Sequence, residues 1–245
     1  MSLNSKSLAS GGSPTASSPP PRPEQTEDHM TMEVETRLAA LERQLQDLSD
    51  REAIRNIIHR YCRAADRCDL EAFKSCYWPD GYDDHGFFGG NAHEFCEYVI
   101  PVLKQVDSSI HAITNTIIDL KGDRAFCESQ WSVVHRLRNP EGDGFLDYWH
   151  QGRYIDIFEK RDGEWKILTR TIAGDMDRLV RTKDMRTILD QFSGVETRGP
   201  ENRTDRGARS PHDPVYVGFD LPVIGQMRDP MPDLWAGFYA LDKVL

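Results

Sequence analysis

The chain has 245 residues, of which 38% are hydrophobic and 9% aromatic, and it carries a formal net charge of -10 with an isoelectric point near 5.3. This acidic balance argues against nucleic acid or an anionic membrane surface as a partner, because a phosphate-rich surface is bound by a basic face. The sequence has neither an apolar stretch long enough to span a bilayer nor the apolar N-terminal segment of a secretory signal, so we expect a cytoplasmic protein.

The N-terminal part divides into a polar tail and a helix. Residues 1–31 are dominated by Ser, Pro, Gly and Thr and are expected to be disordered, because they have too little apolar surface to offset the entropy of ordering. Residues 32–48 predict a helix with a narrow leucine seam, formed by Val34, Leu38, Leu41, Leu45 and Leu48. This leucine seam either packs on the helix's own domain or joins the subunits of a homo-oligomer, a dimer or a trimer.

Residues 49–180 are expected to form the main domain, which begins with helices. Ser49-Asp50-Arg51-Glu52 has the pattern of a capping box and predicts that a new helix starts here. The apolar stripe of that helix consists of Ile54, Ile57, Ile58, Tyr61 and Ala65. The helix should end near Asp66, and two short helices over 70–77 and 91–106 should follow.

Strand patterns dominate the rest of this domain. Four stretches rich in apolar and β-branched residues predict strands over 111–120, 124–137, 147–160 and 164–173. Helices followed by strands that are joined by tight turns indicate an α+β fold rather than a parallel βαβ fold. We therefore expect a cone-shaped α+β barrel, in which helices pack on the concave face of a curved antiparallel sheet and leave a ligand pocket at its mouth.

The pattern loosens towards the C-terminus. Residues 181–245 are expected to form an extended tail, with an edge strand over Val215–Leu221 and aromatic side chains from Trp235–Tyr239. This tail either covers the chain's own pocket or contacts another subunit.

The sequence lacks the motifs of the common cofactor sites. It has no phosphate-binding loop, dinucleotide fingerprint or nucleophile elbow, so no organic cofactor is expected. His85 and His93, with Asp83 and Asp84 nearby, lack the spacing of a zinc site and are interpreted as part of a solvated loop, so no metal is expected either. The five cysteines include no CxxC pair and are expected to be reduced and mostly in the core.

A few polar residues stand alone on apolar elements. Asp66 ends the core-facing helix, and His111 begins a strand that otherwise consists of Ala, Ile and Thr. His135 and Arg170 share one face of their strands with apolar neighbours under the two-residue period. Each of these residues, taken alone, is more typical of a cap or a structural hydrogen bond than of catalysis.

Two segments of the sequence resemble a known family. The stretch 61–69, Tyr-Cys-Arg-Ala-Ala-Asp-Arg-Cys-Asp, with Phe73 and Tyr77-Trp78 after it, is similar to the start of SnoaL-like domains in the nuclear-transport-factor-2-like superfamily. The later stretch 161–167, Arg-Asp-Gly-Glu-Trp-Lys-Ile, shows the same likeness. The resemblance covers about Leu48 to Asp177, implies a cystatin-like barrel, and looks closest to a lyase group of scytalone dehydratase, hexachlorocyclohexane dehydrochlorinase and bile-acid 7α-dehydratase.

In that lyase group an aspartate near the end of the first helix orients a histidine that removes a proton from carbon. The resemblance assigns these two roles to Asp66 and His111. It also places Tyr61 at the position of a catalytic tyrosine, His135 at that of a second histidine or acid, and Arg170 at that of an active-site arginine. The chemistry is consistent, because a carboxylate that holds one ring N–H fixes the tautomer of the base and stabilises the imidazolium that forms.

The expected function is a cofactor-independent lyase of the dehydratase or dehydrohalogenase type. It would remove a proton from carbon of a mid-sized, small-molecule hydrophobic ring substrate through Asp66 and His111. Two alternatives are an isomerase or cyclase that uses the same pair, and a non-catalytic member of the superfamily that binds a ligand or supports an assembly. Ala65 precedes Asp66 where scytalone dehydratase has a tyrosine, so the resemblance does not extend to the substrate of that enzyme.

Overall fold

The computed structural model describes residues 23–142, 144–183, 209–211 and 213–216. The chain divides into two units, Met1–Gln46 and Asp47–Leu245, which are considered separately. Of the N-terminal segment expected to be disordered, residues 1–22 lie outside the described residues, and a helix begins at Pro23. No helix among the described residues is long and apolar enough to cross a membrane.

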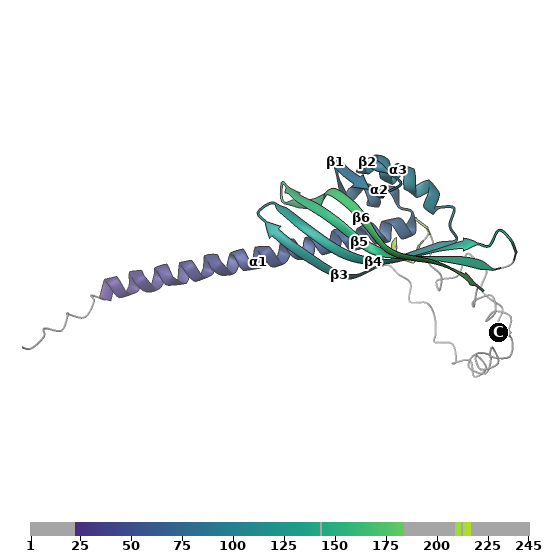
Figure 1. Ribbon diagram of the computed structural model, residues 1–245. Coiled ribbons are helices and arrows are strands. Elements are labelled where there is room, and N and C mark those ends of the chain that lie inside the picture. The colour runs from purple at the N-terminus through teal and green to yellow at the C-terminus, as the bar shows by residue number, and fades with distance from the viewer. Residues whose placement is uncertain (1–22, 143, 184–208, 212, 217–245) are drawn as a thin grey trace, which may run out of the picture. The chain divides into compact units, whose positions relative to one another are not determined.

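Helix α1 runs without interruption over Pro23–Arg67 (Figure 1). The predicted start of a new helix at Ser49 is therefore wrong. The side chain of Asp50 accepts hydrogen bonds from Trp165 Nε1 at 2.7 Å and from Lys160 Nζ at 2.9 Å. Because this carboxylate anchors the helix to a strand hairpin, the polar residues at this point mark a tertiary contact rather than a cap.

One mixed sheet contains the six strands of the described residues, in the order β2-β1-β6-β5-β4-β3 (Figure 1). The strands are β1 (Tyr77–Asp84), β2 (Gly89–Asn91), β3 (Ser108–Lys121), β4 (Arg124–Arg138), β5 (Phe145–Arg161) and β6 (Glu164–Thr182). The strands β3 to β6 match the four predicted strands and pair antiparallel. The α+β class is thus confirmed, but the sheet is not purely antiparallel. β1 follows helices α1 and α2 in the chain and pairs in parallel with β6, a strand about ninety residues later.

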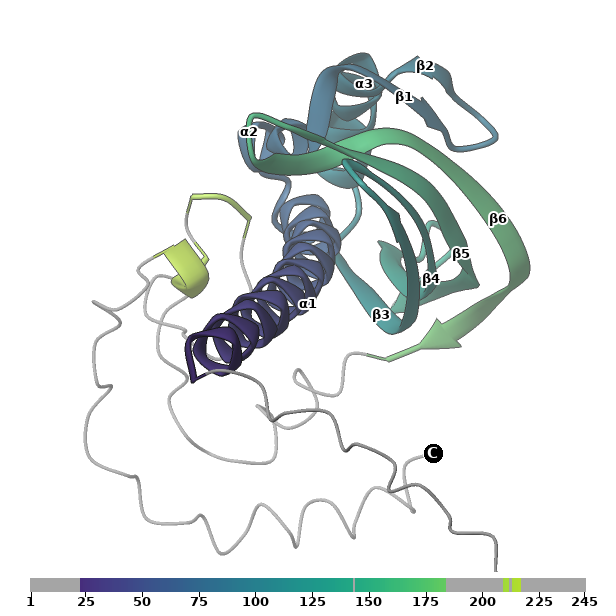
Figure 2. The ribbon, with the colours of Figure 1, turned by 90° about the vertical axis from the view of Figure 1, so that its left-hand side faces the viewer.

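The sheet is strongly curved, as Figure 2 shows for β3 to β6. Register shifts interrupt the β3–β4 pairing between Ile113 and Thr116 and the β5–β6 pairing next to Gly152. Such bulges increase the bend and the twist of a sheet. At Gly152 the backbone of Ala173 and the ring of Trp131 approach so closely that a Cβ atom would not fit, so the bend requires glycine here.

Helices of the second unit cover the concave face of this sheet (Figure 2). Helices α2 (Leu70–Ser75) and α3 (Ala92–Leu103) are both shorter than predicted and begin at the N-caps Asp69 and Asn91. The core between the helices and the strands includes Ile54 and Ile58 of α1, Phe73 of α2 and Phe95 of α3, together with the strand residues Phe158 and Ile167. This packing fixes the C-terminal end of α1 beside the sheet, where the candidate site lies.

The described part of the C-terminal tail contacts the end of α1. The backbone N–H of Ser210 donates to the carbonyl of Arg67 at 2.6 Å, and the Arg67 guanidinium pairs with Asp213 at 3.0 Å. Pro214–Tyr216 forms a short 3-10 helix, so the predicted edge strand does not start here. The remainder of that predicted strand and the segment Trp235–Tyr239 lie outside the described residues.

Arg209 binds the last turn of α1. Its guanidinium donates to the carbonyl of Asp66 and, at 3.2 Å each, to the carbonyls of Leu103 and Val106 at and just beyond the end of α3. The last carbonyls of a helix have no partner within the helix. One side chain of the tail therefore satisfies carbonyl groups at the ends of two helices.

Candidate active site

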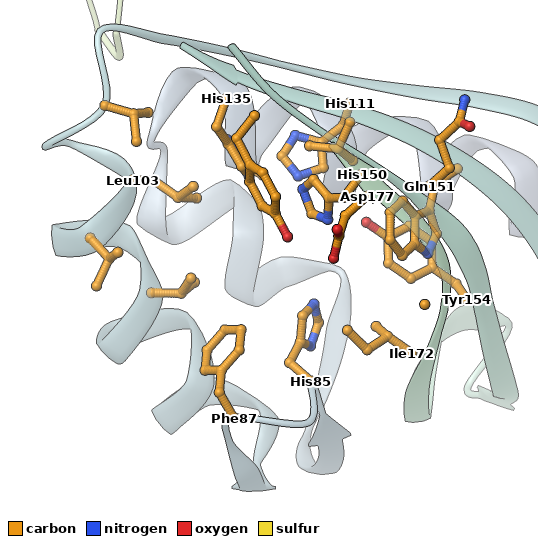
Figure 3. Close-up of a pocket in the computed structure, with 18 of the residues that line it drawn as sticks. His85, Phe87, Leu103, His111, His135, His150, Gln151, Tyr154, Ile172 and Asp177 are labelled. Atoms are coloured by element: carbon orange, nitrogen blue, oxygen red, sulfur yellow. The ribbon is translucent and has the colours of Figure 1, made fainter. Parts of the chain in front are cut away.

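A cavity of about 760 Å³ lies on the concave side of the sheet, bounded by α1, α3 and strands β3 to β6. Its size is typical of small-molecule sites. Its apolar wall includes Phe73, Phe95, Val99, Leu103, Val133 and Ile172. The ionisable or hydroxyl-bearing residues in the wall include Tyr61, His85, His111, His135, His150 and Asp177, most of which Figure 3 shows around one space. A mainly apolar wall with a few converging polar groups suits a small hydrophobic molecule with one or two polar atoms.

The end of α1 and the start of β3 bring Asp66 and His111 together. His111 Nδ1 lies 2.7 Å from Asp66 Oδ1, and the backbone N–H of His111 donates to Asp66 Oδ2 at 2.9 Å. An ionised carboxylate only accepts hydrogen bonds, so the neutral ring of His111 carries its proton on Nδ1 and leaves Nε2 unprotonated. His111 lines the cavity. A neutral imidazole held in this tautomer can take a proton from a bound molecule.

Two further histidines, His135 on β4 and His150 on β5, lie beside His111. The ring centroids of His135 and His111 are 5.6 Å apart, and those of His135 and His150 are 5.2 Å apart. Burial lowers the pKa of His135 to about 3 and the pKa of His150 to about 4, and the neighbouring histidines act in the same direction. Both rings are therefore neutral near pH 7. They can hydrogen-bond a polar atom of a ligand but are not imidazolium acids.

Tyr61 contributes a hydroxyl from the cavity-facing stripe of α1. Its ring packs against Phe73 and Tyr154, with centroid distances of 4.5 and 5.6 Å, and over the guanidinium of Arg170. Burial raises the pKa of Tyr61 well above its usual value, so the hydroxyl keeps its proton at neutral pH. The hydroxyl oxygen lies 3.3 Å from Nε2 of His85.

Arg170 lies beneath the cavity wall and not in it, in contrast to the expectation of an arginine that stabilises an anionic substrate. Its side chain is 0% exposed and donates two hydrogen bonds to Asp156, at 2.8 and 2.7 Å. The guanidinium lies near both the Tyr61 and the Tyr154 ring, at 4.1 and 3.9 Å from their centroids, and the two rings meet edge to face. Arg170 therefore supports the aromatic floor of the cavity, since Tyr61 and Tyr154 separate it from the ligand space.

Asp83 and His85 belong to the cavity region, which corrects their interpretation as solvated loop residues. Asp83 on β1 is fully buried, and its carboxylate contacts Nδ1 of His85. A tight turn follows, closed by a hydrogen bond from His85 N to Phe88 O at 2.9 Å and containing Gly86 at φ +77°. This turn directs the His85 ring into the wall, where it stacks on Phe95 with a centroid distance of 4.1 Å.

The remaining candidate groups are placed elsewhere. Asp84 and His93 do not line the cavity, and within the described ranges no three His, Cys, Asp or Glu side chains group as metal ligands would. All five cysteines are free and buried. Burial raises the pKa of Cys62 and Cys127 to about 12 and that of Cys76 to about 11, which makes these thiols poor nucleophiles.

Several polar cavity residues, among them His85, His150 and Asp177, were not identified as such from the sequence. His150 shares the two-residue period of its strand with Tyr154, and that alternation was a usable signal. Asp177 pairs with His150 in the β5–β6 register, but it lies beyond the predicted end of the last strand. No local pattern identified His85. Its side chain points into the cavity because of a turn that follows β1, and the sequence does not predict that strand.

The fold and the histidine-lined cavity define an α+β domain with a curved sheet and a small-molecule site. Residues 46–171, just over half of the chain, match the SnoaL-like domain family. The chain therefore belongs to the SnoaL-like domain family, which confirms the resemblance seen in the sequence. The matched residues include Tyr61, Asp66, His111, His135 and Arg170.

Solved structures of low sequence identity share this fold. The hexachlorocyclohexane dehydrochlorinase LinA type 2 is 19% identical, with 64% of this chain and 97% of that chain covered and a TM-score of 0.50. LinA itself has the same identity and TM-score, with 98% of its chain covered. The protein Kfla4162 from Kribbella flavida is 17% identical over 54% of this chain and 95% of that chain, also with a TM-score of 0.50. At these identities the likeness supports the fold alone.

Proposed function

We propose that this protein is a cofactor-independent lyase in which His111 removes a proton from carbon of a hydrophobic ring substrate. The main support is the contact of 2.7 Å between His111 Nδ1 and Asp66, which leaves Nε2 of a cavity-lining histidine as the proton acceptor. Asp66 would stabilise the imidazolium that forms when the proton is taken. A SnoaL-like fold shared with dehydrochlorinases agrees with this reaction class.

Elimination also requires acidification of the C–H bond and departure of a neighbouring group. His135 and Tyr61 are the candidates for these two tasks. His135 stays neutral because burial lowers its pKa to about 3, which suits a hydrogen bond to a substrate carbonyl oxygen. Tyr61 retains its proton, which suits donation to a departing group. General acid–base assistance of this kind contributes about 10²–10⁴-fold to the rate.

The composition of the cavity wall favours a neutral substrate of medium size. A volume of about 760 Å³ accommodates a ring compound with substituents. The described wall contains no Lys or Arg, whereas it contains the carboxylates of Asp175 and Asp177. Arg153 pairs with Asp175, but an anionic ligand would still meet the carboxylate of Asp177 with no Lys or Arg in the described wall. A neutral carbonyl-bearing or halogenated ring is therefore the expected partner.

The test combines ligand discovery with two substitutions. Ring ketones and chlorinated cyclohexanes are screened for thermal stabilisation of the full chain, and the compounds that bind are assayed for elimination. In an elimination assay, His111→Ala should reduce kcat about 10²–10⁴-fold, because the proton acceptor is lost. Asp66→Asn should also slow the reaction strongly, because an amide can hold the imidazole in the wrong tautomer.

Asp69→Asn is the matched control for Asp66→Asn. Asp69 caps α2 by accepting a hydrogen bond from the backbone N–H of Ala72, does not line the cavity, and asparagine caps a helix equally well. This variant should keep both stability and activity. Wild-type activity in His111→Ala would refute the lyase, and tight ligand binding without turnover in the wild type would instead indicate a binding protein.

An isomerase that uses the same pair is distinguished by its product. Isomerisation returns a product of the same mass and, in deuterium oxide, incorporates deuterium at the new position. Elimination releases water or chloride and lowers the mass. Mass spectrometry of the product therefore separates the two reactions on the same substrate.

A further inference from the structure

A second aspartate–histidine pair faces the cavity. Asp83 on β1 contacts Nδ1 of His85, whose side chain lines the wall and is 13% exposed. Figure 3 shows His85 on the side of the cavity away from His111 and His135. A molecule bound in this cavity therefore lies between two imidazoles, each of which is held by its own carboxylate.

Four side chains form a continuous hydrogen-bonded chain around His85. The Tyr77 hydroxyl donates to Asp83 Oδ2 at 2.5 Å, and the other carboxylate oxygen of Asp83 contacts His85 Nδ1. His85 Nε2 in turn lies 3.3 Å from the Tyr61 hydroxyl. Because an ionised carboxylate only accepts hydrogen bonds, Nδ1 of His85 carries a proton and Nε2 is the atom that exchanges one with Tyr61.

The surroundings of this chain indicate more than a packing role. Asp83 is 0% exposed and lies opposite Arg170 in the β1–β6 register. A buried carboxylate is costly unless donors compensate it, and both of its oxygens have one here. The stacking of His85 on Phe95, at an angle of 21° between the rings, fixes the ring plane. An imidazole that is oriented and charge-compensated beside a cavity is suited to proton transfer.

Tyr61 needs a proton source behind it if it acts as an acid. Burial raises its pKa well above the usual value, so a phenolate left after proton donation would be unstable. The Arg170 guanidinium, 4.1 Å from the ring centroid, offsets only part of that cost. A proton delivered from His85 in the same event avoids the phenolate.

We propose that Asp83 and His85 supply the proton that Tyr61 donates to the leaving group, on the side of the cavity opposite His111. This inference rests on the proposed lyase function and names a part of its machinery. Asp83 is the positioning residue, because it holds His85 with Nε2 directed at Tyr61 and stabilises the imidazolium from which the proton comes.

The atoms balance in a dehydration. His111 Nε2 takes the proton from carbon, the C–H electron pair becomes the new C=C bond, and the bond between the neighbouring carbon and the hydroxyl oxygen breaks. The departing oxygen takes the Tyr61 proton and leaves as water, while Tyr61 takes the Nε2 proton of the His85 imidazolium. Solvent then removes one proton from His111 and returns one to His85.

This proton relay, which runs from His85 through Tyr61 to the leaving group, makes the enzyme favour one kind of leaving group over another. A hydroxyl departs readily only when it is protonated, whereas chloride departs without a proton. A dedicated proton source opposite the base is therefore needed for dehydration and superfluous for dehydrochlorination. The substrate class that fits is a neutral ring with a carbonyl group and a hydroxyl group on the carbon β to it.

The experiment compares two leaving groups on one ring. Loss of water from 3-hydroxycyclohexanone and loss of chloride from 3-chlorocyclohexanone both yield the same ultraviolet-absorbing enone, and the spontaneous rates are subtracted. His85→Gln, Asp83→Asn and Tyr61→Phe should each reduce kcat for the hydroxyl compound at least about 10-fold more than for the chloro compound. His111→Ala should slow both reactions alike. His93→Gln, at a histidine outside the wall, is the control and should behave like the wild type.

Equal losses on the two compounds would overturn the relay, because a merely structural defect does not distinguish leaving groups. Wild-type activity of both His85→Gln and Tyr61→Phe on the hydroxyl compound would overturn it too. Neither result affects the lyase proposal, which fails separately if His111→Ala stays active or if no ring compound is turned over. Independently of turnover, ¹⁵N spectra of the histidines test the hydrogen-bonded chain itself: a neutral His85 with its proton on Nε2 refutes the relay. A proton on Nδ1 that moves in Asp83→Asn supports it.

Discussion

Arg170 shows how a residue can belong to a site without touching a ligand. Its guanidinium is held by Asp156 and lies against the rings of Tyr61 and Tyr154. A cation between aromatic faces is favourable where water is excluded. The positive charge also stabilises the ionised form of Tyr61 in the wall, so Arg170 influences the electrostatics of the cavity through that ring.

Arg170→Met should therefore destabilise the protein by about 3–5 kcal/mol, because it leaves the carboxylate of Asp156 buried and unpaired. The double variant Arg170→Met/Asp156→Leu should regain part of that loss. The measurement is the free energy of unfolding in urea. Arg153→Met is the control, since the Arg153–Asp175 pair is exposed and a loss below about 1 kcal/mol is expected. Equal losses in the two single variants would contradict the role assigned to Arg170.

Asp66 and His111 could be predicted as site residues because local sequence patterns indicate where a helix ends and where a strand begins. Arg170 is also fully buried, but through a register shift in β6 rather than strict alternation, since the buried positions of the strand run Trp165, Ile167, Arg170. The local pattern also does not show that Tyr61 and Tyr154 already fill the space above Arg170. That depends on how closely α1 approaches β5 and β6, which is a matter of tertiary packing.

At the scale of elements, the end of α1 is held by several contacts from the described part of the C-terminal tail. Its last turn carries Asp66, and Arg209 binds the Asp66 carbonyl together with those of Leu103 and Val106. Hydrogen bonds from a charged donor are stronger than those from a neutral one. The tail thus binds the helix turn that carries the carboxylate orienting His111.

Arg209→Ala should lower the free energy of unfolding by about 1–3 kcal/mol, because carbonyls at two helix ends lose a charged donor. It should also lower kcat in an elimination assay, since Asp66 is less firmly placed. Arg209→Lys should lie between this variant and the wild type. Arg67→Gln removes the ion pair with Asp213 but keeps Arg209, so it serves as the control. If Arg67→Gln had the larger effect on kcat, the tail would act through another contact.

The strand that the sequence did not reveal is β1. It contains Pro79, Gly81 and several acidic residues, all of which are rare in strand interiors. Its pairing with β6 joins segments that are about ninety residues apart, and no local pattern encodes such a partner. Because His85 follows β1 directly, missing this strand also meant missing the second aspartate–histidine pair. The four long strands were predictable because hairpin turns and alternation are local features.

At the scale of the whole molecule, we propose that the leucine seam of α1 joins copies of this chain. The seam residues Val34, Leu38, Leu41, Leu45 and Leu48 are 53–68% exposed, which is unusual for five aliphatic side chains at heptad spacing. A second and a third copy offer the same stripe, so a short parallel coiled coil would bury it.

Sedimentation of the full chain at micromolar concentration should show a dimer or a trimer. The double variant Leu38→Gln/Leu41→Gln should shift it to the monomer, because it removes the centre of the stripe. Arg37→Gln/Arg43→Gln changes neighbouring positions outside the stripe on the same helix and should leave the oligomer intact. A monomeric wild type would refute the proposal.

The distance along the chain between Arg209 and the helix that it binds has a consequence for the order of assembly. The cavity residues of the described part of the chain all precede residue 178, whereas the arginine that binds the carbonyl of Asp66 comes 143 residues after that residue. On the ribosome the sheet and the helices can thus associate around the cavity before the last turn of α1 is secured. A nascent chain would pass through a stage with a formed cavity and a loosely held aspartate, and the site would become competent only when the tail emerges.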